Sequence, residues 1–312
     1  MTYQQIQTLS HQKTKFNYLK WGSGEQAIVM LHGFPETPEI WESTFQHLDP
    51  HTFTVYAPYL PGYSDHDKNQ KSMTPFELGV WVNLFTETIS NQEKIDKKIC
   101  LVAHDFGAVA AYMATALNPG LYNFYLALSI PPIATYLKGF VKQPLLSFRR
   151  RYMLKFILPL GISELWMKRN NYQALRHINL VWAEGRKNSS EFFSTNLPYH
   201  KLPNLNGPFS LYKGLFPSAR NLGNWRKTLR TAFKKISVPT YIAVGKNETT
   251  YPADVFQGFW QAFTSDVDVS FNVINDCGHF IPLDRPDFIA KVINDYHFKS
   301  GVSNPTLKLA NS

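Results

Sequence analysis

The stretch that decides the fold is LVAHDFGA at residues 101–108. An apolar run, typical of a buried strand, leads into an Asp flanked by small residues, and a helix-like segment follows at 108–117. Small residues two positions before and after Asp105 suit a sharp turn from strand to helix, because larger side chains would clash there. The sequence therefore predicts a turn that lifts the Asp105 side chain above the sheet and points the next backbone N–H at it.

Asp105 stands where such turns usually carry a serine, and a serine needs a base to remove its proton. The reference pKa of an aspartic acid is about 3.9, so this side chain is already an anion at neutral pH. A carboxylate nucleophile suits attack on a strained or polarised sp3 carbon, which leaves a covalent ester on the protein. The alternative interpretation is that Asp105 only caps the following helix.

Two further motifs favour the nucleophile over the helix cap. LHGFPE at 31–36 follows an apolar stretch, and NDCGHF at 275–280 follows the alternating stretch 269–274. Three such motifs in this order, each at the end of an expected strand, resemble those of the α/β-hydrolase superfamily and, within it, of the epoxide hydrolases. The resemblance extends over nearly the whole chain.

The resemblance implies an α/β-hydrolase fold, with a mostly parallel sheet flanked by helices and an inserted helical cap domain. It also implies that the backbone N–H groups of Phe34 and Phe106 form an oxyanion hole and that His279 is the catalytic histidine. In this family the histidine activates a water molecule, which hydrolyses the ester formed on Asp105. We therefore expect a hydrolase that opens epoxides to vicinal diols through a covalent aspartyl ester, without a cofactor.

The histidine of this family needs an acidic partner, which fixes its tautomer and stabilises its charged form. Glu248 lies three residues after the Gly that ends the strand-like run 241–245, and we expect it to be this acid. The family usually has Asp at this step, so Glu248 departs from the pattern. Asp254 and Asp276 are the alternatives, although Asp276 is so close to His279 in sequence that the loop would have to fold back sharply.

Two tyrosines are the expected proton donors. Opening an epoxide generates an alkoxide, and a neutral tyrosine hydroxyl can protonate it. The family places two cap tyrosines over the nucleophile. Tyr152, followed by Pro159 and Glu164, resembles the first, and Tyr212 in GPFSLYK at 207–213 resembles the second. The alternative is that both are amphipathic residues that fill the packing of the helical region.

Phe106 departs from the family pattern, which usually has Trp directly after the nucleophile. Haloalkane dehalogenases use that indole to hold the leaving halide, and fluoroacetate dehalogenases usually have Arg there, so Phe106 counts against both. A haloalkane or haloacid dehalogenase with the same Asp, His and acid is nevertheless the alternative function. A non-catalytic α/β-hydrolase that binds a ligand is the second alternative, and the complete set of Asp105, Glu248 and His279 argues against it.

Three residues are candidates for substrate binding: Trp41, Arg151 and Lys155. Trp41 ends a segment, 27–41, in which the resemblance is strong. Arg151 and Lys155 flank Tyr152, where the family tends to be aromatic, and two positive charges at this position favour an anionic substrate.

Alternation of strand-like and helical segments predicts a mostly parallel sheet covered on both faces. The expected strands are 16–21, 27–31, 53–57, 99–102, 124–130, 240–244 and 269–274. The alternation stops in a mainly helical stretch that is rich in Arg, Lys, Trp and Tyr. We predict a core domain of residues 1–131 and 232–312 and a helical cap domain of residues 132–231.

Charge is distributed unevenly between these two parts. Residues 132–231 hold 17 Lys and Arg against 3 acids, a net charge of +14, whereas the rest of the chain carries −5. One interpretation is a basic lid that attracts anionic or lipid-like epoxides or contacts a membrane surface; the other is a solvated helical surface without a particular partner. Nucleic acid is not expected, because no binding motif accompanies the charge.

Composition sets the remaining expectations. The chain has 312 residues, of which 44% are hydrophobic, so it can build a substantial core. We expect a monomer or a homodimer. Two cysteines, Cys100 and Cys277, give no disulfide framework and favour a reducing compartment. No other Cys or His stands near Cys277 and His279 at ligand spacing, so no metal is expected. The chain begins without a recognisable signal peptide, and we predict a cytoplasmic protein.

Overall fold

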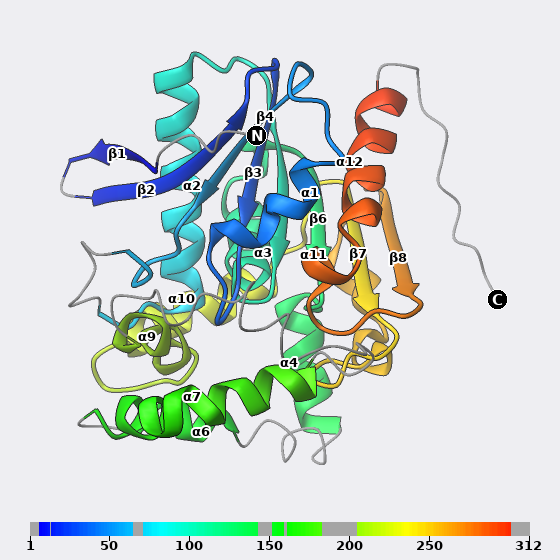
Figure 1. The fold of residues 1–312 in the computed structure, drawn as a ribbon. Coiled ribbons are helices and arrows are strands. Elements are labelled where there is room, and N and C mark those ends of the chain that lie inside the picture. Colours follow the sequence, from blue (N-terminus) through cyan, green and yellow to red (C-terminus); the bar gives the residue numbers. More distant parts are fainter. Residues whose placement is uncertain are drawn as a thin grey trace.

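The fold is built on one eight-stranded sheet with the order β1-β2-β4-β3-β5-β6-β7-β8 (Figure 1). The computed structural model describes residues 6–12, 14–64, 71–142, 152–158, 161–182 and 205–300. The strands are β1 (Gln7–His11), β2 (Thr14–Gly22), β3 (Gln26–Leu31), β4 (Phe53–Pro58), β5 (Ile99–His104), β6 (Tyr122–Leu128), β7 (Thr240–Gly245) and β8 (Val269–Ile274). The pairs β1–β2 and β2–β4 are antiparallel and the other five are parallel, so the predicted fold class is confirmed.

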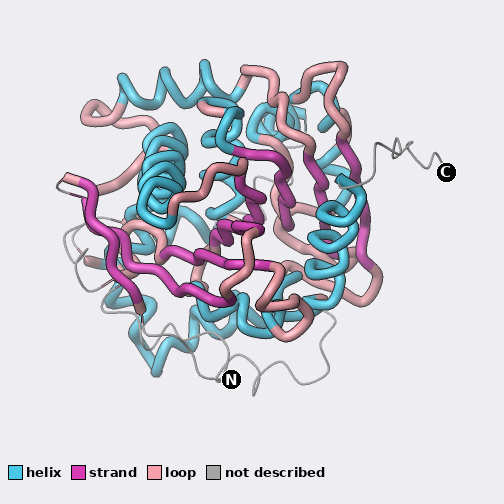
Figure 2. Tube along the Cα trace, turned by 90° about the horizontal axis from the view of Figure 1, so that it is seen from above, coloured by secondary structure: helices cyan, strands magenta, loops and turns pink. Residues whose placement is uncertain are grey.

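Helices cover both faces of this sheet, and Figure 2 shows the strands as a twisted band between them. On one face α2 (Pro75–Glu93) packs on α3 (Phe106–Leu117); on the other, α1 (Glu42–Phe45) and α11 (Ile281–Asp284) pack with α12 (Pro286–Ser300). Short 3-10 helices are η1 (Pro38–Trp41), η3 (Pro119–Leu121), η5 (Ala253–Phe256) and η6 (Phe259–Ala262). Central strands such as β4 and β6 are apolar and almost wholly buried, because neither face of a covered parallel sheet meets water.

Between β6 and β7 the chain leaves the sheet and forms the helical insert, residues 132–231. Its described helices are α4 (Ile133–Lys142), α6 (Tyr152–Phe156), α7 (Ile162–Trp182), α9 (Asn206–Gly214) and α10 (Leu222–Ala232). In Figure 1, α6, α7 and α9 lie beyond the carboxyl ends of the parallel strands. In parallel α/β folds that edge of the sheet carries the binding site. The division of the chain into a core domain and a cap domain stays a prediction.

The insert docks on the start of α2, and the local sequence explains how. Thr74 caps this helix and forms a capping box with Glu77, while Pro75 occupies the first turn. The second carboxylate oxygen of Glu77 accepts a hydrogen bond from Asn224 of α10 at 2.7 Å. Thr228 of α10 accepts one from the backbone of α2 at 3.2 Å. One glutamate therefore stabilises the helix start and holds the insert against the core.

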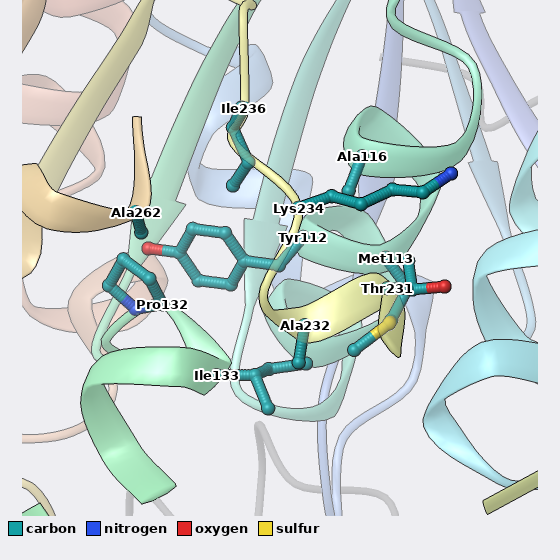
Figure 3. A pocket seen from close by; sticks show the side chains of 10 residues that line it. All are labelled: Tyr112, Met113, Ala116, Pro132, Ile133, Thr231, Ala232, Lys234, Ile236 and Ala262. Atoms are coloured by element: carbon teal, nitrogen blue, oxygen red, sulfur yellow. The ribbon is translucent and has the colours of Figure 1, made fainter. Parts of the chain in front are cut away.

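Both ends of the insert meet at one place. Pro132 and Ile133, where the chain leaves the sheet, line a small pocket together with Thr231 and Ala232, where it returns (Figure 3). Tyr112 of α3 lies in the same pocket, and its hydroxyl donates to the Ile130 carbonyl at 3.1 Å. The two connections between the insert and the core therefore lie side by side against the helix that follows Asp105.

No helix among the described residues is long and apolar enough to cross a membrane.

Candidate active site

Asp105 stands at the turn between β5 and α3, with φ at +48°. A side chain other than glycine rarely adopts such a φ, so the surroundings must hold it there. Two glycines permit this. A Cβ on Gly107 would lie 2.4 Å from the Leu31 carbonyl oxygen, and a Cβ on Gly33 would lie 2.4 Å from the Asp105 Cβ. The Asp105 side chain makes no capping hydrogen bond to α3, which argues against the helix-cap interpretation.

The loop after β3 reaches the Asp105 carboxylate. The Phe34 backbone N–H donates to Asp105 Oδ1 at 2.9 Å. Phe106 begins α3 directly after Asp105, and among the described residues its N–H makes no hydrogen bond to this carboxylate. Of the two backbone donors that the sequence predicts, the structure therefore brings one into contact with Asp105 and leaves the other next to it in the chain.

His279 lies in the loop after β8 and stands between two carboxylates. Its Nδ1 lies 2.5 Å from Glu248 Oε2, and its Nε2 lies 3.5 Å from Asp105 Oδ2. The first contact is a short hydrogen bond and the second an ion-pair contact, because 3.5 Å is long for a hydrogen bond. All three side chains are buried. Glu248, His279 and Asp105 thus form one line from the end of β7 to the end of β5.

Glu248 is the one of the three candidate acids that contacts His279. Its other oxygen, Oε1, accepts hydrogen bonds from the backbone N–H groups of Thr250 at 2.6 Å and Tyr251 at 3.2 Å. These bonds fix the carboxylate so that Oε2 faces the imidazole. Asp254 and Asp276, which are also described, are both exposed.

The pKa values of His279 and Asp105 shift in opposite directions. Burial lowers the pKa of His279, but the charges of Glu248 and Asp105 outweigh it and hold this pKa well above its usual range. Burial raises the pKa of Asp105, but the contact with His279 and the Phe34 N–H outweigh it and keep this pKa below its usual value. These two shifts favour an ionised Asp105 beside a protonated His279.

A second buried layer fixes the histidine loop. His104 Nδ1 lies 2.9 Å from a Glu36 oxygen, which also accepts from the Gly33 N–H at 2.8 Å. His104 Nε2 lies 2.8 Å from the carbonyl of His279, and the Ser129 hydroxyl donates to that carbonyl at 2.7 Å. Sequence reasoning did not select Glu36, His104 or Ser129, although the first two lie inside the motifs that decided the fold.

Tyr212 of α9 approaches the site from the insert. Its ring packs against Phe106 at 4.7 Å and Phe34 at 5.0 Å between ring centroids, and it is buried. The Gly-Pro that precedes it has a steric reason, because a Cβ on Gly207 would lie 1.9 Å from the Gly62 carbonyl oxygen. This close backbone approach seats α9 on the core. The structure thus brings Tyr212 against both residues whose N–H groups are the predicted oxyanion donors.

Comparisons with known proteins identify the family of the chain. The model of the alpha/beta hydrolase family matches residues 28–292. The chain belongs to the alpha/beta hydrolase family.

Relatives of this α/β-hydrolase include "Epoxide hydrolase 3" of Mus musculus, 23% identical over 275 residues that span 87% of this chain and 71% of the relative. "Soluble epoxide hydrolase" of Corynebacterium sp. (strain C12) is 25% identical over 289 residues, 88% of this chain and 91% of the relative. Epoxide hydrolase I of potato (Solanum tuberosum) is similar in structure, with a TM-score of 0.72, 20% identity, and coverage of 95% and 99% of the two chains. A putative acyltransferase from Salmonella enterica reaches a TM-score of 0.76 at 18% identity, with coverage of 94% and 95%, so structural likeness shows the fold alone.

The insert of this α/β-hydrolase also contacts the histidine directly. The backbone N–H of His279 donates to the carbonyl of Trp182, the last residue of α7, at 3.0 Å. The Trp182 ring is buried and lies 5.4 Å from the imidazole between centroids. Nothing in the sequence singled out Trp182, because the contact joins residues that are 97 positions apart. The end of α7 is therefore part of the wall around His279.

The structure does not bring the remaining predicted site residues into contact with Asp105 or His279 within its described ranges. Tyr152 begins α6, but its side chain and all of Arg151 lie outside the described residues. Lys155 is exposed, and its ammonium lies over the ring of Trp166 at 4.5 Å. Trp41 is wholly buried, and its indole N–H makes no hydrogen bond within the described part of the chain. Substrate binding by Trp41, Arg151 and Lys155 stays a prediction.

Cys277 packs inside the histidine loop of the hydrolase, where its thiol is buried and lies 3.6 Å from the Gly278 carbonyl. No group of three His, Cys, Asp or Glu side chains in the described ranges is arranged to hold a metal ion.

Proposed function

We propose that this protein hydrolyses epoxides to vicinal diols through a covalent ester on Asp105. The observation that carries the proposal is the line Glu248–His279–Asp105, with the nucleophile oriented by the Phe34 N–H. A carboxylate rather than a hydroxyl at this turn suits an sp3 carbon as the target. The epoxide hydrolases among the relatives support the same substrate class.

In the first step Asp105 attacks one carbon of the epoxide ring. A bond forms between that carbon and a carboxylate oxygen, and the ring C–O bond breaks, so its electron pair passes to the departing oxygen. Tyr212, together with Tyr152, donates a proton to this alkoxide. Tyr212 suits the role because it packs beside Phe34 and Phe106, directly over the nucleophile turn. The products of this step are a hydroxy ester on Asp105 and one tyrosinate.

Formation of the ester prepares His279 for the second step. The negative charge of Asp105 is one of the causes that raise the pKa of His279, and esterification removes it. The pKa of the imidazole then falls, and its proton passes to the tyrosinate. Alkylation of Asp105 thus lowers the pKa of His279 and favours the neutral imidazole that hydrolysis requires.

In the second step neutral His279 removes a proton from water, and the resulting hydroxide attacks the carbonyl carbon of the ester. The Phe34 N–H, which donates to Asp105 Oδ1, would stabilise the negative oxygen of the tetrahedral intermediate. The ester C–O bond to the diol then breaks, and the diol oxygen takes the remaining proton of the attacking water. Asp105 is again a carboxylate and His279 is again protonated, so atoms and protons balance.

We further propose that the preferred epoxides are anionic or lipid-like. The net charge of +14 on residues 132–231 would attract a carboxylate towards the insert, and salt would screen this attraction over about 8–10 Å. An epoxide that carries a carboxylate should then show a higher kcat/KM than its neutral ester, with a gap that narrows as salt rises. Equal kcat/KM values for the two substrates at low ionic strength would show that the charge of the insert does not influence substrate choice.

Hydrolysis of carbon–halogen bonds is the competing function, because the same three residues would serve it. Phe106 counts against it, since a phenyl ring offers no hydrogen bond to a departing halide. A ligand-binding protein without catalysis has no need of an ionised Asp105 aligned with His279 and Glu248. Oligomeric state and a cytoplasmic location stay predictions.

The test is a panel of epoxides and haloalkanes assayed side by side, combined with intact-mass spectrometry of His279→Gln. This variant should form the ester but hydrolyse it slowly, so its mass should rise by that of one epoxide. Asp105→Asn is the matched control and should not gain mass. Turnover of haloalkanes without turnover of any epoxide would replace the proposal with the dehalogenase function.

A further inference from the structure

Four large apolar side chains stand exposed where α6 meets α7. The exposed fractions are 55% for Leu154, 39% for Leu158, 45% for Ile162 and 72% for Leu165. We call these four residues the apolar corner. Single exposed leucines are ordinary on protein surfaces, whereas four within twelve residues form a patch of the kind that marks an interaction site.

Hydrogen bonds and buried side chains hold the two helices of the apolar corner in place. The Ser163 hydroxyl donates to the carbonyls of Lys155 at 2.7 Å and Leu158 at 3.2 Å, which ties the end of α6 to the start of α7. On the inner side of the same helices, Phe156 and Met167 are wholly buried. These two helices therefore bury apolar side chains against the core and also expose the four side chains of the apolar corner to solvent.

Basic side chains accompany the apolar corner. Lys155, Lys168 and Arg169 are exposed on the same two helices. Residues 132–182 contain nine Lys and Arg but one acid, Glu164, which is only partly exposed. A partner for this surface must therefore accept apolar side chains and positive charges together.

We propose that the apolar corner docks this protein on the surface of an anionic lipid bilayer. Leucine and isoleucine side chains would enter the boundary between headgroups and acyl chains, while the lysines and arginine would meet the phosphate and carboxylate groups of the lipids. A second copy of the chain is a poor occupant, because a symmetric dimer through this face would bring two like-charged surfaces together. The inference does not depend on the proposed epoxide chemistry.

The apolar corner lies where the flat surface of a bilayer could reach it. In Figure 1, α6 and α7 lie at the lower edge of the molecule, as the end of α4 does, on the side away from β1 and the upper end of α12. A bilayer could therefore meet the corner without touching the sheet. The end of α7 lies against His279, so a docked molecule would present to the lipid the same insert that contributes to the active-site wall.

The experiment is cosedimentation of the full chain with vesicles of phosphatidylcholine, alone or mixed with phosphatidylserine. The protein should pellet with the mixed vesicles, bind the neutral ones at least about tenfold more weakly, and dissociate as salt rises. The double change Leu154→Ser with Leu165→Ser should weaken binding to the mixed vesicles by about tenfold or more. Lys168→Ala with Arg169→Ala should do the same.

Phe298→Ser is the matched control, because Phe298 is 64% exposed on α12, in the core part of the chain. It should bind the mixed vesicles like the parent. Circular dichroism and the thermal unfolding midpoint should be unchanged in all variants, which separates docking from folding.

Three results would overturn the proposal. The first is equal sedimentation of the parent with neutral and anionic vesicles. The second is a loss of binding in Phe298→Ser equal to that of the leucine double variant. The third is a concentration-dependent dimer that the leucine double variant dissociates, which would make a second copy the occupant of the corner.

Discussion

The strand ends and the helical insert are two differently built parts of one site. At the strand ends, Asp105, Glu248 and His279 are buried, and short contacts fix both carboxylates and the histidine loop. The insert is basic, exposes apolar side chains, and reaches the site through Tyr212 and Trp182. Under the proposed function the two parts have different roles: the core supplies the nucleophile and the base, and the insert supplies the proton donor, one wall of the site and the choice of substrate.

The largest effect is expected in the core, at the nucleophile. Asp105→Asn should reduce turnover by at least about 10⁴-fold, because a neutral amide is a poor nucleophile. The rate should be measured on freshly prepared protein whose mass has been verified, since slow deamidation would restore the acid. Turnover at the parental rate by such a preparation would exclude Asp105 as the nucleophile.

Glu248→Gln should slow turnover by about 10²- to 10⁴-fold, because the neutral amide no longer stabilises the charged imidazole. Ester formation does not need His279 as a base, so the second step should suffer more and the ester should accumulate in pre-steady-state samples. Asp276→Asn, at an exposed position, is the control and should leave the rate unchanged. If Glu248→Gln kept the parental turnover rate and Asp276→Asn were inactive, Asp276 and not Glu248 would be the acidic partner of His279.

On the insert side, Tyr212→Phe and Tyr152→Phe should each slow epoxide opening, and the double variant should nearly abolish it. Loss of a donor to the developing alkoxide should cost roughly 2–4 kcal/mol of transition-state stabilisation, by analogy with other oxyanion donors. Single-turnover ester formation is the measurement, and Tyr296→Phe on α12 is the control. If the double variant opened epoxides at the parental rate, the insert would not be the proton donor.

The contact between the insert and His279 should have a smaller and selective effect. Trp182→Ala should slow ester hydrolysis by about tenfold while ester formation stays near the parental rate, because the missing indole lets the imidazole shift. Trp166→Ala removes an indole of the same helix that packs on Lys155, and it should leave both steps unchanged. Equal slowing of both steps in Trp182→Ala would indicate a general loss of folding instead of a role at His279.

The sequence predicts which side chains meet at the strand ends for a physical reason. The motifs around Asp105 and His279 are local, since a strand end, a glycine and a catalytic side chain lie within a few neighbouring residues. The predicted helix at 108–117 in fact begins at Phe106, because Asp105 itself is the turn residue. Strand β1 was not expected: its alternation is weak, and as an edge strand it buries only Leu9.

The rest of the site depends on contacts between distant residues, and a single sequence does not contain them. Ser129 and His104 both reach the His279 carbonyl across the sheet, and Trp182 reaches its N–H from the insert. Ser129 and Trp182 lie outside the three motifs, and His104, although inside one, reaches the His279 carbonyl only through the fold. Their functions follow from the strand order, which brings the ends of β5, β6 and β8 to the same edge of the sheet.

The most direct test of the account is a single turnover of excess enzyme with an epoxide in water labelled with oxygen-18. The account predicts an unlabelled diol and label in the peptide that contains Asp105, because the new diol oxygen comes from the carboxylate and the water oxygen replaces it. Label in the diol of the first turnover, with an unlabelled Asp105 peptide, would show direct attack of water on the epoxide and would contradict the covalent mechanism.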